Sequence, residues 1–229
     1  MQHVLTDLSG ERFTPQYVKD ERLRKRQEAI ARLRKTVISC DLGRNIDRSV
    51  VCGLDCTPES IHVGNIEAYV RQDYNSLADR LLQIRAAVPD ALLVFDATGV
   101  GQGVLDLFLA RGLRPDLAVI ITSGTQVHFG RDVTGVPKMN IPKADLVGYI
   151  IRVLNEGRIH INPNAAGAAL LQNELQQFQA VVRSTGHIAY SAPAGKHDDA
   201  VMSLAVGVAG YARIARQLQR PSASMRRLY

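Results

Sequence analysis

The sequence of 229 residues has no tryptophan and only three cysteines. Cys40, Cys52 and Cys56 are odd in number and stand in apolar, strand-like stretches, so we expect buried thiols in a reducing compartment. Cys52 and Cys56 with His62 have the wrong spacing for a zinc knuckle and lack a fourth ligand, which argues against zinc. No apolar run is long enough to cross a membrane, and the N-terminus does not have the pattern of a signal peptide.

Nucleotide-binding loops are missing as well. No G-x-x-x-x-G-K-[ST] loop occurs anywhere in the chain. Gly99, Gly101 and Gly103 resemble a dinucleotide loop only loosely, because their spacing is not G-x-G-x-x-G and no acid follows about 20 residues on at a second strand end. No internal repeat, low-complexity tract, recognition helix or zinc finger is visible.

The composition predicts one large domain with basic ends. Apolar residues make up 46% of the chain, enough for a full core. The net charge of +6 divides into +4 over residues 1–35, −3 over 36–210 and +5 over 211–229. Basic ends fit attraction to a polyanion such as nucleic acid, although solvated tails explain them equally well.

The hydrophobic pattern predicts a mixed α/β domain. Residues 15–35 favour a peripheral helix or linker, and short β-rich runs at 36–40, 49–54 and 61–70 favour an antiparallel meander. Helices and strands then alternate, with 123–141 a long loop or an exposed hairpin. We expect helices over 73–88, 104–110, 143–156, 165–179 and 197–218, strands over 91–96, 117–122 and 158–162, and a second hairpin over 181–191. Such an order predicts a mixed sheet with helices on both faces.

Acidic residues occupy three notable positions. Asp41 ends the first strand, Asp96 ends a continuous apolar run, and Asp198 and Asp199 open a helix that is apolar all round. Charges at the start of a buried helix are costly unless they are paired, and N-capping explains one of these two. Functional groups gather at the carboxyl ends of strands, so we expect the three positions to meet if the two strands are neighbours.

Carboxylates that share one locus need a cation. Ligation by oxygen alone favours Mg²⁺ or Mn²⁺. Two such ions ~3.5–4 Å apart would activate a water and stabilise the leaving oxygen in phosphodiester cleavage. Taken singly, each aspartate also fits a plain structural role, such as ending a strand at a turn.

The same motifs resemble the C-terminal nuclease domain of large terminase subunits, the DNA-packaging motors of tailed bacteriophages. The likeness spans about 36–210 and rests on Asp41-Leu42-Gly43 with Asp47, Val94-Phe95-Asp96-Ala97-Thr98-Gly99-Val100-Gly101, Pro142-Lys143-Ala144-Asp145-Leu146, Asn155-Glu156-Gly157-Arg158-Ile159, Leu171-x-x-Glu174-Leu175-x-x-Phe178 and His197-Asp198-Asp199-Ala200-Val201-Met202-Ser203-Leu204-Ala205. It implies a ribonuclease H-like fold, shared with Holliday-junction resolvases and integrases. It also implies a metal-dependent endonuclease that cuts concatemeric viral DNA during genome packaging.

By this resemblance, Asp41, Asp96 and one or both of Asp198 and Asp199 are the catalytic ligands of two Mg²⁺ or Mn²⁺ ions. Asp199 is favoured, because in similar resolvases the metal-binding aspartate directly precedes the small and apolar residues of the helix. Asp47 matches a recurrent acid of the family and is interpreted as structural. Candidate DNA-binding or auxiliary residues are Lys143, Arg131, Lys138, Lys196 and His197.

Large terminase subunits carry an ATPase domain before the nuclease, and too few residues precede Thr36 for one here. We therefore expect an excised domain or a nuclease whose motor is a separate chain. The predicted division is a basic helix or linker over 1–35, a nuclease domain over 36–213 and a basic tail over 214–229. The implied partners, in the host cytoplasm and without a membrane, are double-stranded DNA, a terminase ATPase domain, the small terminase subunit and the portal protein.

Two alternatives stay open at this point. One is a Holliday-junction resolvase or a transposase-like nuclease of the same fold. The other is a portal- or motor-docking module with weak nuclease activity.

Overall fold

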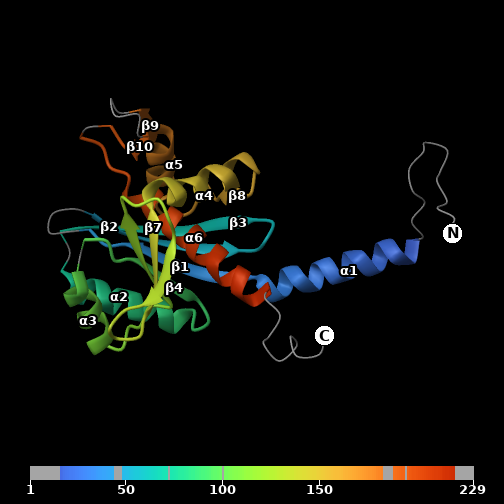
Figure 1. Ribbon diagram of the computed structural model, residues 1–229, viewed down its shortest axis with the longest axis horizontal. Helices are drawn as coiled ribbons and strands as arrows, with labels where there is room; N and C mark the ends of the chain where they lie inside the picture. Colours follow the sequence, from blue (N-terminus) through green and yellow to red (C-terminus); the bar gives the residue numbers. More distant parts are fainter. Residues whose placement is uncertain are drawn as a thin grey trace.

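The computed structural model describes residues 16–43, 48–71, 73–99, 101–182, 188–193 and 195–219. Eight strands form one mixed sheet in the order β6-β7-β5-β4-β1-β2-β3-β8 (Figure 1). They are β1 Lys35–Asp41, β2 Arg48–Cys56, β3 Ile61–Val70, β4 Leu92–Asp96, β5 Leu117–Thr122, β6 His128–Arg131, β7 Pro137–Pro142 and β8 Ile159–Ile161. Strands β9 Gln179–Val182 and β10 Ile188–Ser191 pair separately as a hairpin.

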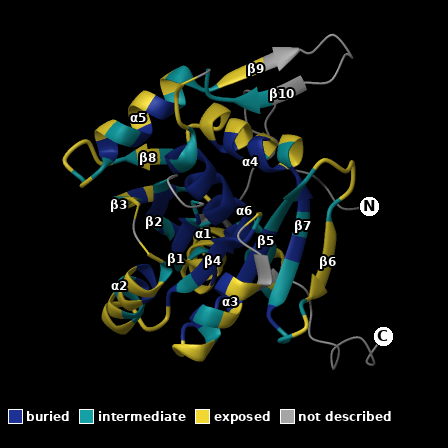
Figure 2. Cartoon of the chain, turned by 90° about the vertical axis from the view of Figure 1, so that its left-hand side faces the viewer, coloured by how far each residue is buried: buried dark blue, intermediate teal, exposed yellow. Residues whose placement is uncertain are grey.

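Helices cover both faces of the sheet, as the sequence pattern predicts (Figure 2). The helices are α1 Gln16–Leu33, α2 Tyr74–Ala87, α3 Gly101–Ala110, α4 Lys143–Asn155, α5 Ala168–Gln177 and α6 Asp199–Gln219. Helices α4, α5 and α6 enclose one apolar core with the sheet, and α2 and α3 enclose the other. Helix α1 projects away from the sheet and is mostly exposed (Figure 1). No helix of the described residues is long and apolar enough to span a membrane.

The predicted meander is confirmed and continues into parallel strands. Strand β1 pairs antiparallel with β2, which pairs antiparallel with β3. On its other side β1 pairs parallel with β4, and β5 and β7 extend this parallel half. Strand β4 is therefore central and buried on both faces, which explains its continuous apolar run.

Two boundaries differ from the sequence prediction. Helix α3 begins at Gly101 rather than Val104, because the turn at Thr98 and Gly99, which has a φ of +82°, already redirects the chain. The hairpin expected over 123–141 forms, but β7 is not exposed. Met139 and Ile141 alternate on its buried face and attach it to β5.

Helix α6 lies against the middle of the sheet. It packs on β1, β2 and β4, and residues 200–211 are buried. Two glycines allow this close approach, since a Cβ on Gly210 would lie 2.8 Å from both γ-carbons of Val94. A Cβ on Gly207 would lie 2.8 Å from the Ser39 hydroxyl oxygen. The glycines therefore set the distance between α6 and the strands.

We predict that Gly210→Ala destabilises the protein, although alanine is the better helix former. The new methyl group overpacks against Val94, at a cost of ~1–3 kcal/mol. Each kcal/mol lowers the melting temperature by ~2–4 °C in a domain of this size. Gly148→Ala in α4 is the matched control, because its Cβ meets nothing within 4 Å and should add up to ~1 kcal/mol. Equal melting temperatures for the two variants would contradict the close approach.

Candidate metal centre

The site is built on two neighbouring parallel strands. Asp41 ends β1, Asp96 ends β4, and the two are direct cross-strand partners. Neighbouring strands lie ~4.8 Å apart, and cross-strand partners point to the same face of the sheet. Their face is that of α6, because Val37 and Val94, further back on the same sides of the strands, belong to the core that α6 closes. The sequence prediction that the two strands are neighbours is confirmed.

Helix α6 brings its two acidic residues to this pair from above the sheet. Both carboxylates lie near enough to Asp41 to affect its ionisation. The helix is held over β1 by the Ser203 hydroxyl, which donates to the Ser39 carbonyl at 3.2 Å. Asp41, Asp96, Asp198 and Asp199 thus gather at one end of α6, as predicted.

Basic side chains contact the α6 carboxylates. Arg48 Nε donates to Asp199 Oδ2 at 3.0 Å, and Lys143 Nζ donates to Asp198 Oδ2 at 3.3 Å. His197 Nδ1 lies 3.5 Å from the same Asp199 oxygen. In contrast, no hydrogen bond or salt bridge from the described residues reaches the Asp41 carboxylate, and the Asp96 carboxylate accepts one from its own turn, from Thr98 N at 2.7 Å.

Burial makes the strand carboxylates hard to ionise. It raises the pKa of Asp41 well above its ordinary value, and the carboxylates of Asp96, Asp199 and Asp198 raise it further, while Lys143 lowers it. Burial also raises the pKa of Asp96, against the hydrogen bonds from Thr98 and the charge of Lys143. The locus therefore carries more negative charge than its own basic residues neutralise.

A divalent cation of the Mg²⁺ type fits this donor set. The ligands on offer are carboxylate oxygens, which hard cations prefer, and Asp41 and Asp96 are close, buried and not ion-paired within the described residues. Among the described residues, no three His, Cys, Asp or Glu side chains already stand as a closed metal-binding group. The α6 carboxylates, which Arg48 and Lys143 hold, account for the open side of the arrangement.

The auxiliary candidates divide into two groups. Lys143 is the first residue of α4 and reaches the carboxylates, and Lys196 and His197 directly precede α6. Arg131 and Lys138 lie on the edge hairpin β6–β7, where Lys138 points to the other face of the sheet because its neighbour Met139 points toward α6. The structure thus brings Lys143 and His197 to the site and leaves the hairpin residues at its margin. Asp47 lies outside the described residues.

Sequence reasoning missed two residues of the site, Arg48 and Glu174. Glu174 is 5% exposed on α5, accepts hydrogen bonds from the first amides of α6 and pairs with Arg48 at 2.6 Å. Burial raises the pKa of Glu174, while these hydrogen bonds and Arg48 oppose the rise. A detectable signal existed for Glu174, since an acid on the buried stripe beside Leu171 needs a partner. Arg48, the first residue of a strand after a turn, has no comparable signal.

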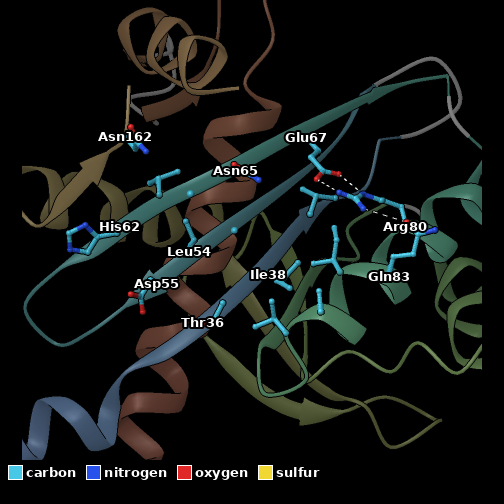
Figure 3. A pocket seen from close by; sticks show the side chains of 17 residues that line it. Thr36, Ile38, Leu54, Asp55, His62, Asn65, Glu67, Arg80, Gln83 and Asn162 are labelled. Atoms are coloured by element: carbon cyan, nitrogen blue, oxygen red, sulfur yellow. Dashed lines mark hydrogen bonds and ion pairs between the residues drawn. The ribbon is translucent and has the colours of Figure 1, made fainter. Parts of the chain in front are cut away.

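A cavity of about 620 Å³ lies elsewhere, between α2 and the strands β1, β2 and β3 (Figure 3). It opens above Gly53 and Gly64, which have no side chains to fill it, and it is bordered by the Arg80–Glu67 ion pair. Ile38 on its wall belongs to the α2 face of the sheet, opposite the carboxylates. None of the candidate site residues lines this cavity.

No protein-family model and no curated protein sequence matches this chain. Among solved structures, the large terminase nuclease from thermophilic phage G20c is similar at 21% identity over 78% of this chain and 83% of that one, with a TM-score of 0.56. The same nuclease with bound magnesium gives 20%, 77%, 81% and 0.55. A large terminase from another thermophilic bacteriophage gives 11% identity over 77% of this chain but only 39% of that one, at 0.55. The predicted ribonuclease H-like fold, as found in large terminase nucleases, is confirmed.

We predict that Asp41→Asn stabilises the metal-free protein. The folded state holds a proton on Asp41 at pH values where the unfolded chain has lost it, so wild-type stability falls as pH rises above about 4 toward the raised folded pKa. Asparagine does not ionise and escapes this loss. In EDTA, the melting temperature of Asp41→Asn should therefore exceed that of wild type by a margin that grows with pH, at ~2–4 °C per kcal/mol. A constant or shrinking margin would show that the Asp41 carboxylate is not disfavoured by folding.

Proposed function

We propose that this protein is a metal-dependent endonuclease that cleaves double-stranded viral DNA during genome packaging. The observation that carries the proposal is the cross-strand pair Asp41–Asp96 beneath the acidic start of α6. The fold supports it, because the similar G20c protein is a large terminase nuclease and its structure has been solved with bound magnesium and with bound cobalt. A composite of carboxylates on this fold is suited to cleave phosphodiesters.

In this proposal Asp41, Asp96, Asp199 and Asp198 hold two Mg²⁺ or Mn²⁺ ions. When bound, such ions supply an activated water and stabilise the charge on the departing oxygen. Asp41 and Asp96 provide the buried base of the site, and α6 closes it from above. Lys143 partly neutralises Asp198 and offers a cation to a DNA phosphate. His197 and the exposed Lys196 stand at the entrance, where they can contact the same backbone.

Binding to DNA in this proposal is mainly electrostatic. Arg131 and Lys138 extend the basic surface along the edge hairpin β6–β7. Contacts to phosphates position a protein without reading sequence, so we expect low sequence specificity and strong salt dependence. The predicted tail begins within α6, which continues to Gln219, and residues 220–229 lie outside the described part.

We further propose that the chain works beside a terminase ATPase. The chain matches only 39% of the second phage's large terminase, so that protein contains more than this domain. Contact with the small terminase subunit and the portal protein belongs to the same proposal, as does a place in the host cytoplasm. The predicted division at 35/36 and 213/214 is retained as part of it.

We predict that Asp96→Asn lowers nicking of supercoiled plasmid by at least ~100-fold at saturating Mn²⁺ or Mg²⁺. Losing one carboxylate of the buried pair removes several kcal/mol of charge stabilisation, and each ~1.4 kcal/mol is tenfold in rate. Asp90→Asn, on an exposed residue before β4, is the matched control and should nick like wild type. The plasmid assay with EDTA tests the metal requirement.

Nicking that survives in Asp96→Asn would sink the assignment. Four-way junctions offered beside linear duplex separate the alternatives: preferential cutting of junctions would favour a resolvase of the same fold. A wild-type protein that binds a portal or motor ring but barely nicks would favour a docking module.

A further inference from the structure

The N-terminus of α6 is capped by another helix. Asp198 stands at the capping position, since its carbonyl accepts the first helical hydrogen bond, from Met202 N at 2.8 Å. An aspartate at this position ordinarily accepts hydrogen bonds from the second and third amides of its own helix. Here those amides, of Ala200 and Val201, donate to Glu174 Oε2 at 2.7 and 3.3 Å. The Asp198 side chain is relieved of capping and reaches Lys143 instead.

Glu174 is fixed at both of its oxygens. Its Oε1 accepts a hydrogen bond from Arg48 Nη2 at 2.6 Å, while Oε2 is held by the amides of α6. Arg48 in turn donates from Nε to Asp199 Oδ2 at 3.0 Å. The side chains of Glu174, Arg48 and Asp199 are 5%, 18% and 19% exposed, so the network is shielded from water and its interactions are strengthened.

Arg48 lies next to the strand carboxylates. It stands two residues before Val50, which is the cross-strand partner of Asp41, and therefore on the same face of the sheet. From there its guanidinium occupies one oxygen of Asp199 and leaves the other for a further partner. Its planar, forked donors suit two carboxylates at once.

We propose that Glu174 and Arg48 are positioning residues of the carboxylate site. Glu174 caps α6 in place of Asp198, which frees the Asp198 side chain for the site, and Arg48 orients the Asp199 carboxylate. This inference rests on the proposed function. Without the Glu174 carboxylate, Asp198 is the acceptor closest in sequence to the exposed amides and turns back onto its own helix. Groups that orient metal ligands typically change metal affinity ~10–100-fold.

The test measures Mn²⁺ affinity in two ways, by the Mn²⁺ concentration that gives half-maximal nicking and by Mn²⁺ binding followed with electron paramagnetic resonance. Glu174→Ala should raise both values ~10-fold or more, with the maximal rate regained at high Mn²⁺. Glu174→Gln keeps an acceptor for the amides but turns an NH₂ group toward Arg48, so its shift should be smaller. Arg48→Met should weaken binding, and Arg48→Lys should recover part of it.

A double-mutant cycle separates positioning from general destabilisation. If Asp198 is recaptured as a cap in Glu174→Ala, then adding Asp198→Ala should weaken Mn²⁺ binding much less in that background than in wild type. Independent, multiplying losses would contradict the capping exchange. Thermal denaturation checks folding, and the conservative variants Glu174→Gln and Arg48→Lys carry the comparison where a truncation melts below the assay temperature.

Glu67→Gln is the matched control. It alters an Arg–Glu pair of the same kind, Arg80 with Glu67 at 2.5 and 2.9 Å, which joins α2 to β3 beside the cavity (Figure 3). Its Mn²⁺ dependence should equal that of wild type. Unchanged Mn²⁺ affinity in folded Glu174→Ala and Arg48→Met would overturn the positioning roles, while loss of nicking in Asp96→Asn would still uphold the proposed function. Full nicking by Asp96→Asn would instead refute the function itself.

Discussion

The whole arrangement depends on one register, the alignment of Asp41 with Asp96 across two parallel strands. Carboxylates at this spacing repel each other, and burial removes the water that would screen them. A fold keeps such a pair only if something else offsets the cost, and the nearby cations only partly do so. The pair is therefore a local instability that the surrounding packing must tolerate, which is common at sites that bind metals or substrates.

The packing that tolerates it is centred on α6. Gly207 and Gly210 let the helix approach the strands closely, and the buried residues 200–211 hold it there. Because the helix axis is fixed by this contact, its N-terminus ends directly over the strand carboxylates. The apolar body of the helix thus determines where its two acidic residues lie. Position along the helix and chemistry at its end are consequences of the same packing.

Most of the fold could be predicted from the sequence, because periodicity and turn residues are local signals. The apolar run ending at Asp96 indicated a central strand, and Asp73 indicated the start of α2, where it caps two amides. The edge strand β7 was only partly anticipated, since its attachment to β5 depends on distant residues. The meeting of the four aspartates followed from topology, but their ion pairs did not. Arg48 and Glu174 reach the site through pairings 151 and 26 residues apart, which no local pattern encodes.

Capping of α6 illustrates this limit and changes the meaning of the adjacent aspartates. From the sequence, one of Asp198 and Asp199 could be explained as a cap, which left one for chemistry. In the structure Glu174 supplies the cap, and each aspartate has a separate basic partner, Lys143 or Arg48. Neither is needed to terminate the helix, so both are free to serve the site. Their partners differ in kind: Arg48 is anchored by Glu174, whereas Lys143 is more exposed and bonds as a point charge on a flexible stem. Asp199 is consequently the more rigidly held of the two, which agrees with its assignment as the direct ligand and leaves Asp198 the more adaptable role.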